Sequence, residues 1–70
     1  MDRIEEVYND IDILSQRDEN GVVYLYIANG SKDFRFRMID GKDFTSTKQA
    51  IRYAKGLIDL TKRLRDAESQ

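Results

Sequence analysis

Two Asn-Gly dipeptides, at residues 20–21 and 29–30, divide the middle of this sequence into short segments in which apolar and polar residues alternate. Asn-Gly between such segments is the strongest short-range signal for a β-hairpin. We therefore predict three antiparallel strands joined as a meander, with the second strand at its centre. These strands are expected over residues 11–17, 22–28 and 34–39.

The turns also predict which side chains share a face of the sheet. The second turn can consist of Asn29-Gly30 or of Gly30-Ser31, and both choices place Arg35 and Arg37 on the outer face. A slip of one residue would bury both arginines, and this penalty sets the register. The inner face is then expected to carry apolar side chains, namely those of Val23, Leu25, Ile27, Phe34 and Phe36, with Met38 following.

The first hairpin has a different turn. Residues 19–21 suit a three-residue loop with Gly21 in the left-handed conformation. That loop places Ile11 and Ile13 on the inner face of the sheet. On the outer face it predicts two cross-strand pairs, Leu14 with Tyr26 and Gln16 with Tyr24.

Helical patterns flank the three strands. Apolar residues at positions 4, 7, 8 and 11 predict a short helix over residues 2–10. Ser46 and Gln49 fit a capping box, and the periodicity after them predicts a long helix over residues 46–66. The predicted fold class is therefore α+β. It is a single small domain over residues 1–70, ordered α-β-β-β-α, with a three-stranded antiparallel meander packed on a long C-terminal helix.

Composition excludes several classes of function. The chain has 70 residues and neither Cys nor His, so disulfide frameworks, zinc fingers and histidine bases are ruled out. No apolar run is long enough to cross a membrane. We expect a non-enzymatic cytoplasmic protein with no catalytic residues, no metal, no cofactor and no membrane partner.

Charge is unevenly distributed along the chain, although the net charge is only −1. Residues 1–20 hold seven acidic and two basic residues, whereas residues 21–70 hold six acidic and ten basic residues. The acidic segment is a candidate second binding surface that would mimic nucleic-acid phosphate. The alternative is that these carboxylates stabilise the start of a helix and keep the protein in solution. The candidate residues are Glu5, Glu6, Asp10 and Asp12.

The outer sheet face is the main candidate binding site. Exposed aromatic and apolar residues beside arginine are typical of protein interfaces, and Tyr and Arg are frequent hot spots. Two alternatives stay open, because the short helix could cover this face and tyrosine is common in strands for other reasons. The candidate residues are Leu14, Val22, Tyr24, Tyr26, Arg35 and Arg37.

A third surface is expected at the end of the long helix. At about 1.5 Å per residue this helix is longer than the predicted strands, so its last turns extend past the sheet. Leu60 and Leu64 lie in that overhang and are candidate contacts of a structural homodimer.

Residues 21–60 resemble the arm-type DNA-binding domains of phage and transposon integrases. The resemblance lies in the strand segments 21–27 and 34–37, in the Phe44-Thr45 pair, and in the alanines of the following helix. Those domains read the major groove with the outer face of a three-stranded sheet. The resemblance implies DNA contacts by Tyr24, Tyr26, Arg35 and Arg37.

The whole chain also resembles small phage-encoded inhibitors, including anti-CRISPR proteins, in size, charge and topology. This resemblance implies a protein that blocks a host defence or nucleic-acid-handling complex. The leading hypothesis is therefore a phage or mobile-element regulator or inhibitor with a protein partner. Sequence-specific DNA binding by the outer sheet face and a structural homodimer are the alternatives.

Overall fold

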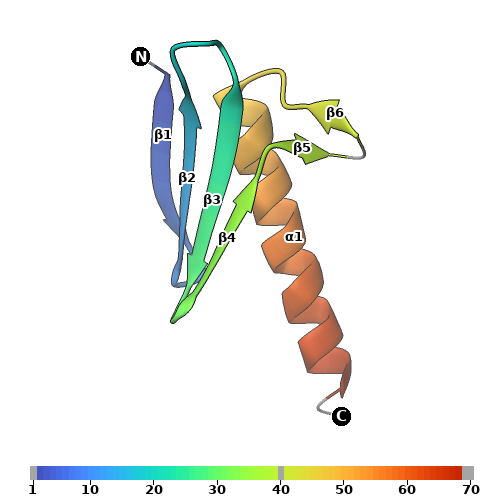
Figure 1. Ribbon diagram of the computed structural model, residues 1–70. Coiled ribbons are helices and arrows are strands. Elements are labelled where there is room, and N and C mark those ends of the chain that lie inside the picture. Colours follow the sequence, from blue (N-terminus) through green and yellow to red (C-terminus); the bar gives the residue numbers. More distant parts are fainter. Residues whose placement is uncertain (1, 40, 69–70) are drawn as a thin grey trace.

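The computed structural model describes residues 2–39 and 41–68, and its chain forms a four-stranded antiparallel sheet with one long helix on one face (Figure 1). The ends of the predicted 1–70 domain, at residues 1 and 69–70, lie outside the described residues. The strands follow one another in the order β1-β2-β3-β4, and a small hairpin precedes the helix. The elements are β1 (Arg3–Tyr8), β2 (Ile11–Arg17), β3 (Val23–Asn29), β4 (Lys32–Phe36), β5 (Met38–Ile39), β6 (Lys42–Asp43) and α1 (Thr47–Glu68).

The predicted α+β class, with an antiparallel sheet against a C-terminal helix, is confirmed, but the leading helix over residues 2–10 is wrong. This segment forms β1, which pairs with β2 and makes the sheet four-stranded rather than three-stranded. Asn9 and Asp10 have φ values of 52° and 65°, so both central residues of the turn are left-handed. Two such residues make a type I′ turn, whose twist matches a tight hairpin. Ile4 and Tyr8 then point to the inner face.

The β3–β4 hairpin has its turn at Gly30-Ser31, and of these two residues Gly30 alone has a positive φ, of 63°. This is a type II′ turn with glycine at its first central position. It pairs Leu25 with Phe36 and Ile27 with Phe34, so the predicted faces are confirmed.

The predicted third strand over residues 34–39 is only partly right. It begins earlier, at Lys32, and the chain bends at Arg37. Met38 therefore leaves the sheet and starts β5, which pairs with β6.

The β2–β3 hairpin has the predicted register, with Leu14 opposite Tyr26 and Gln16 opposite Tyr24. Gly21 is left-handed, with a φ of 82°, as the three-residue loop requires. The Asp18 carboxylate accepts hydrogen bonds from the backbone N–H groups of Asn20 and Val22, both at 2.9 Å. These bonds satisfy loop donors that have no strand partner.

The helix begins with the predicted cap. Ser46 Oγ accepts a hydrogen bond from the Gln49 N–H at 3.1 Å. Gln49 reaches back one residue further than the usual box, because its Oε1 accepts from the Thr45 N–H at 2.6 Å. The helix runs over Thr47–Glu68, two residues longer at its C-terminus than the predicted range of 46–66.

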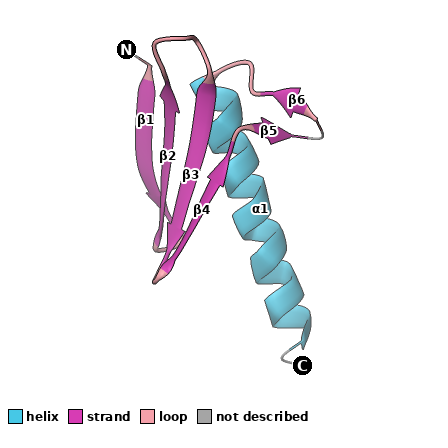
Figure 2. Cartoon of the chain, in the orientation of Figure 1, coloured by secondary structure: helices cyan, strands magenta, loops and turns pink. Residues whose placement is uncertain are grey.

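The core lies between α1 and the inner faces of β1, β2 and β3, against which the helix packs (Figure 2). Within the core Ser15 is fully buried, and its hydroxyl donates to the Tyr24 carbonyl oxygen at 3.2 Å. The buried apolar residues are Ile13, Val23, Leu25, Ile27, Phe44, Ala50, Ile51, Ala54 and Ile58.

No helix in the described part of the chain is long and apolar enough to cross a bilayer.

Side chains from β1 fasten the edge of the sheet to the helix. Tyr8 donates its hydroxyl to Asp59 Oδ1 at 2.9 Å, and Glu6 pairs with Lys55 at 2.8 Å. The Lys55 ammonium also lies 5.6 Å from the centre of the Tyr8 ring. These contacts place β1 beside the middle of α1, and within the described residues no helix packs on the other face of the sheet.

Candidate functional site on the outer sheet face

The outer face of the sheet lies opposite α1, and the helix packs against the other face (Figure 1). One alternative reading of the sequence placed a short helix over this face. That alternative is wrong, because residues 3–8 extend the sheet at its edge instead. The side chains of the outer face are therefore presented by four neighbouring strands of one rigid sheet.

Three outer side chains form a tyrosine–arginine cluster, defined as Tyr24, Tyr26 and Arg35. The two rings are 6.4 Å apart and tilted by 33°. Arg35 is directly opposite Tyr26 in the register, and its guanidinium carbon lies 5.3 Å from the centre of the Tyr24 ring. A cation over an aromatic face is attracted by the ring quadrupole, by about 0.5–1 kcal/mol at an exposed site. The stacked arrangement of the cluster is therefore favoured before any partner binds.

A shallow hollow adjoins this cluster on the side of β1. Its volume is about 460 Å³, and Leu14 lies in it between Glu5 on β1 and Tyr26 on β3. Val7 lines the β1 side of the hollow, and its side chain is 70% exposed. An apolar strip thus runs from the tyrosines across Leu14 to Val7. The lining residues that face outward are Glu5, Val7, Asp12, Leu14, Tyr26 and Ala28.

The structure brings together four of the six predicted binding residues, namely Leu14, Tyr24, Tyr26 and Arg35. Val22 precedes β3 and is half-buried, with its N–H held by the Asp18 loop. Arg37 is exposed at the bend that follows β4. These last two flank the cluster. Val7 and Glu5 were missed as members of this face because their segment was assigned to a helix.

The four predicted acidic residues do not form one surface. Glu5 and Asp12 share the outer face, whereas Glu6 points to the helix side and pairs with Lys55. Asp10 lies in the β1–β2 turn. A single phosphate-like row of carboxylates is therefore absent from this part of the chain.

Both signs of charge occur on the outer faces of the four strands. Glu5 pairs with Arg3 at 3.6 Å, and Arg35 lies at the opposite side of the sheet. Two arginines thus stand against three carboxylates, with a net charge of −1. The charged residues of this face are Arg3, Glu5, Asp12, Asp33 and Arg35.

The predicted dimer contacts lie elsewhere. Leu60 and Leu64 are 54% and 59% exposed on the second half of α1. They do not contribute to the outer sheet face, which is on the other side of the sheet from α1.

No protein-family model, curated protein sequence or solved structure matches this chain. The resemblances to integrase arm-type domains and to phage inhibitors stay predictions. Function must therefore be inferred from the geometry of the outer face itself.

Proposed function

We propose that this protein is a non-enzymatic binding module whose outer sheet face engages a protein partner. The observation that supports this most is the stacked tyrosine–arginine cluster on a sheet face that α1 leaves uncovered. Tyr and Arg are enriched among residues that dominate binding energy. In its most specific form, the module is a phage or mobile-element inhibitor of a host complex, a role that rests on the small size, the charge and the α+β class of the chain.

Pre-organisation favours the cluster as the anchor of the interface. A flexible arginine loses side-chain entropy when it is fixed by a partner, which weakens binding. Here Arg35 already stacks on Tyr24, and the strand beneath Tyr24 is held by the buried Ser15 hydroxyl. Part of the ordering cost is thereby met by the fold. The hollow at Leu14 provides an adjacent apolar recess for a side chain of the partner.

The charge pattern favours protein over DNA as the ligand of this face. Binding to a duplex depends on cations that neutralise phosphates. On the outer faces of the four strands, three carboxylates (Glu5, Asp12 and Asp33) stand against two arginines, and even with Arg37 at its margin this face lacks the excess of cations that phosphate binding requires. A protein surface of mixed charge fits both the acidic side at β1 and β2 and the arginine on β4.

The test compares capture of host proteins by the wild-type chain and by a Tyr24→Ala/Tyr26→Ala variant. A partner of the outer face is expected to bind wild type and to lose affinity by about 30-fold or more in this variant. Arg52→Ala, an exposed change on α1, is the matched control and should bind like wild type. Affinities are measured with the purified partner by calorimetry. Equal binding by all three proteins contradicts the proposal.

Titration of random and genomic duplex DNA tests the alternative ligand. Fluorescence anisotropy at low salt is expected to show no binding by the wild-type chain. Binding that weakens with salt and disappears in Arg35→Ala/Arg37→Ala would replace the protein partner with DNA.

A further inference from the structure

Strand β4 is at one end of the sheet, and within residues 2–39 and 41–68 it pairs only with β3. Its two-residue turn is closed by the pair Asn29 and Lys32. A pair that closes such a turn is hydrogen-bonded, and bonded and non-bonded pairs then alternate along the strand. The backbone groups of Asp33 and Arg35 therefore point away from β3. They form an open edge that another strand can pair with.

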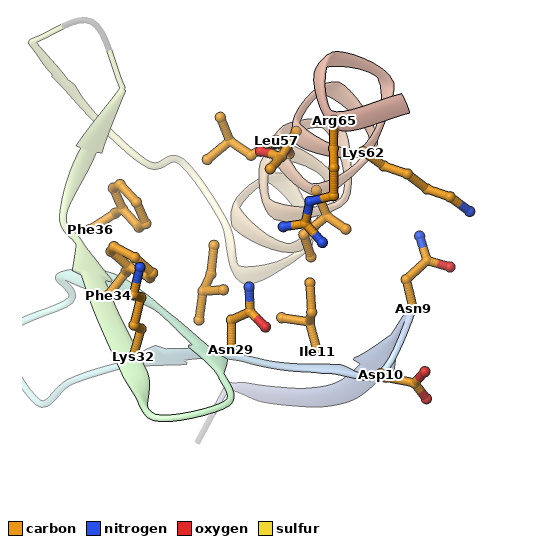
Figure 3. A pocket seen from close by; sticks show the side chains of 13 residues that line it. Asn9, Asp10, Ile11, Asn29, Lys32, Phe34, Phe36, Leu57, Lys62 and Arg65 are labelled. Atoms are coloured by element: carbon orange, nitrogen blue, oxygen red, sulfur yellow. Dashed lines mark hydrogen bonds between the residues drawn. The ribbon is translucent and has the colours of Figure 1, made fainter. Parts of the chain in front are cut away.

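The inner side of β4 is only partly covered, because α1 packs mainly on β1, β2 and β3 and leaves a groove of about 720 Å³ beside β4. In Figure 3, Phe34 and Phe36 extend from β4 into this groove, and Leu57 faces it from the helix. Phe34 is 46% exposed, whereas Phe36 has an edge contact with Tyr53 at 6.2 Å. Phe34 therefore presents apolar surface in the middle of an edge strand, and no group of the described chain covers this surface fully.

The charged side chains on the outer side of β4 are complementary to those of a second, antiparallel copy of β4. Asp33 and Arg35 flank Phe34, and neither forms a salt bridge within the described residues. If two copies of β4 pair antiparallel about Phe34, Asp33 of each copy is opposite Arg35 of the other. Pairing about Asp33 or about Arg35 would instead place like charges opposite each other, which destabilises a sheet. Among the residues of β4, only the register about Phe34 opposes unlike charges without also opposing like ones.

We propose that a second copy of this chain pairs its β4 with this β4, antiparallel and two-fold symmetric about Phe34. Two four-stranded sheets then become one sheet of eight strands. The backbone groups of Asp33 and Arg35 bond across the axis, which makes Phe34 a non-hydrogen-bonded pair with its copy. Side chains of such pairs are the closest in an antiparallel sheet, so each Phe34 ring covers the other. Lys32 lies opposite Phe36 of the second copy.

The occupant is a second copy because a two-fold interface must be complementary to itself. The alternation of Asp33, Phe34 and Arg35 meets this condition without any other sequence. Leu60 and Leu64 follow the groove residue Leu57 at spacings of three and seven, so they lie on the same side of α1 as Leu57, although neither lines the groove. Charged residues on an edge strand can also serve to prevent association, and exchanging the two charges distinguishes these roles.

Sedimentation equilibrium of four proteins tests the register. A five-residue edge makes a small interface, so we expect a dissociation constant between about 1 µM and 1 mM for wild type. Asp33→Arg and Arg35→Asp each place like charges opposite each other twice, and each should weaken association by about tenfold or more. The double variant Asp33→Arg/Arg35→Asp restores two opposite-charge pairs and should regain dimerisation.

Circular dichroism and thermal unfolding verify that each variant is folded, and Arg52→Asp controls for a charge change away from β4. Wild type that remains monomeric to about 1 mM overturns the proposal. Single variants that associate as strongly as wild type, or a double variant that does not recover, also overturn it. In wild type, the amide protons of Asp33 and Arg35 should become protected from exchange as concentration rises.

The dimer and the proposed partner site can fail separately. Tyr24→Ala and Tyr26→Ala leave the backbone edge of β4 and the charges of Asp33 and Arg35 in place, so they should change the dissociation constant of the dimer much less than Asp33→Arg does. Asp33→Arg lies outside the tyrosine–arginine cluster, and its effect on dimerisation is measured with the purified chain alone, so the result does not depend on any partner protein.

Discussion

At the scale of single residues, Tyr8 links the edge strand to the helix through its hydroxyl. The phenol donates to Asp59 Oδ1 at 2.9 Å. This hydrogen bond is the largest cause that raises the pKa of Tyr8, followed by desolvation and by the charge of Asp59, while Lys55 opposes the shift. A phenolate has no proton to donate and would be repelled by the Asp59 carboxylate.

The raised pKa of Tyr8 predicts a loss of stability at alkaline pH. Because the folded pKa lies above the unfolded value of about 10, the contribution is complete below pH 10 and is lost as pH rises through the folded pKa. Urea unfolding should show wild type more stable than Tyr8→Phe near pH 8, with the difference shrinking above about pH 10. A difference that stays constant across this range would contradict the role of the hydroxyl.

At the scale of elements, the β1–β2 turn decides whether the first segment is a strand or a helix. Asn9 and Asp10 both adopt left-handed backbone, which costs ordinary residues about 1–2 kcal/mol and asparagine and aspartate less. Asp10→Gly should therefore raise the free energy of unfolding by up to about 1 kcal/mol, whereas Asp10→Val should lower it. Urea unfolding measures both. A destabilising Asp10→Gly would indicate a helical segment, where glycine is unfavourable.

The sequence predicted the two later hairpins because one-residue slips would bury arginines or expose the core. It did not predict β1, because apolar positions 4, 7, 8 and 11 fit a helix, and the turn lacked the Asn-Gly signal. Val7 is the residue that breaks strand alternation, and in the structure it is 70% exposed. The helical pattern places Val7 on the inward stripe of a helix, so the sequence does not predict that Val7 extends the apolar strip on the outer sheet face.

The same reasoning explains which site residues were found. Leu14, Tyr24, Tyr26 and Arg35 converge because their faces follow from the two correct registers. The splitting of the acidic residues could not be foreseen, since Glu5 and Glu6 point to opposite faces only when their segment is a strand. The bend at Arg37 had no sequence signal either, because the apolar alternation continues through it to Met38.

At the scale of the whole molecule, the helix covers three strands and leaves the fourth beside a groove. Stability is therefore concentrated where α1 meets β2 and β3. Leu25→Ala removes a fully buried side chain and should lower the free energy of unfolding by about 2–5 kcal/mol. Leu64→Ala, on the exposed part of α1, should change it by less than about 0.5 kcal/mol. Chemical unfolding at low protein concentration checks both values.

The meander also determines the order in which a growing chain can assemble. Every strand pair of the sheet joins neighbours in the sequence through connections of two to five residues, so each hairpin closes at little entropic cost. The helix is synthesised after all four strands. Until it leaves the ribosome, Ile13, Leu25 and Ile27 face solvent on a sheet that has already begun to form. Docking of α1 is therefore the step that ends the exposure of the nascent chain to aggregation.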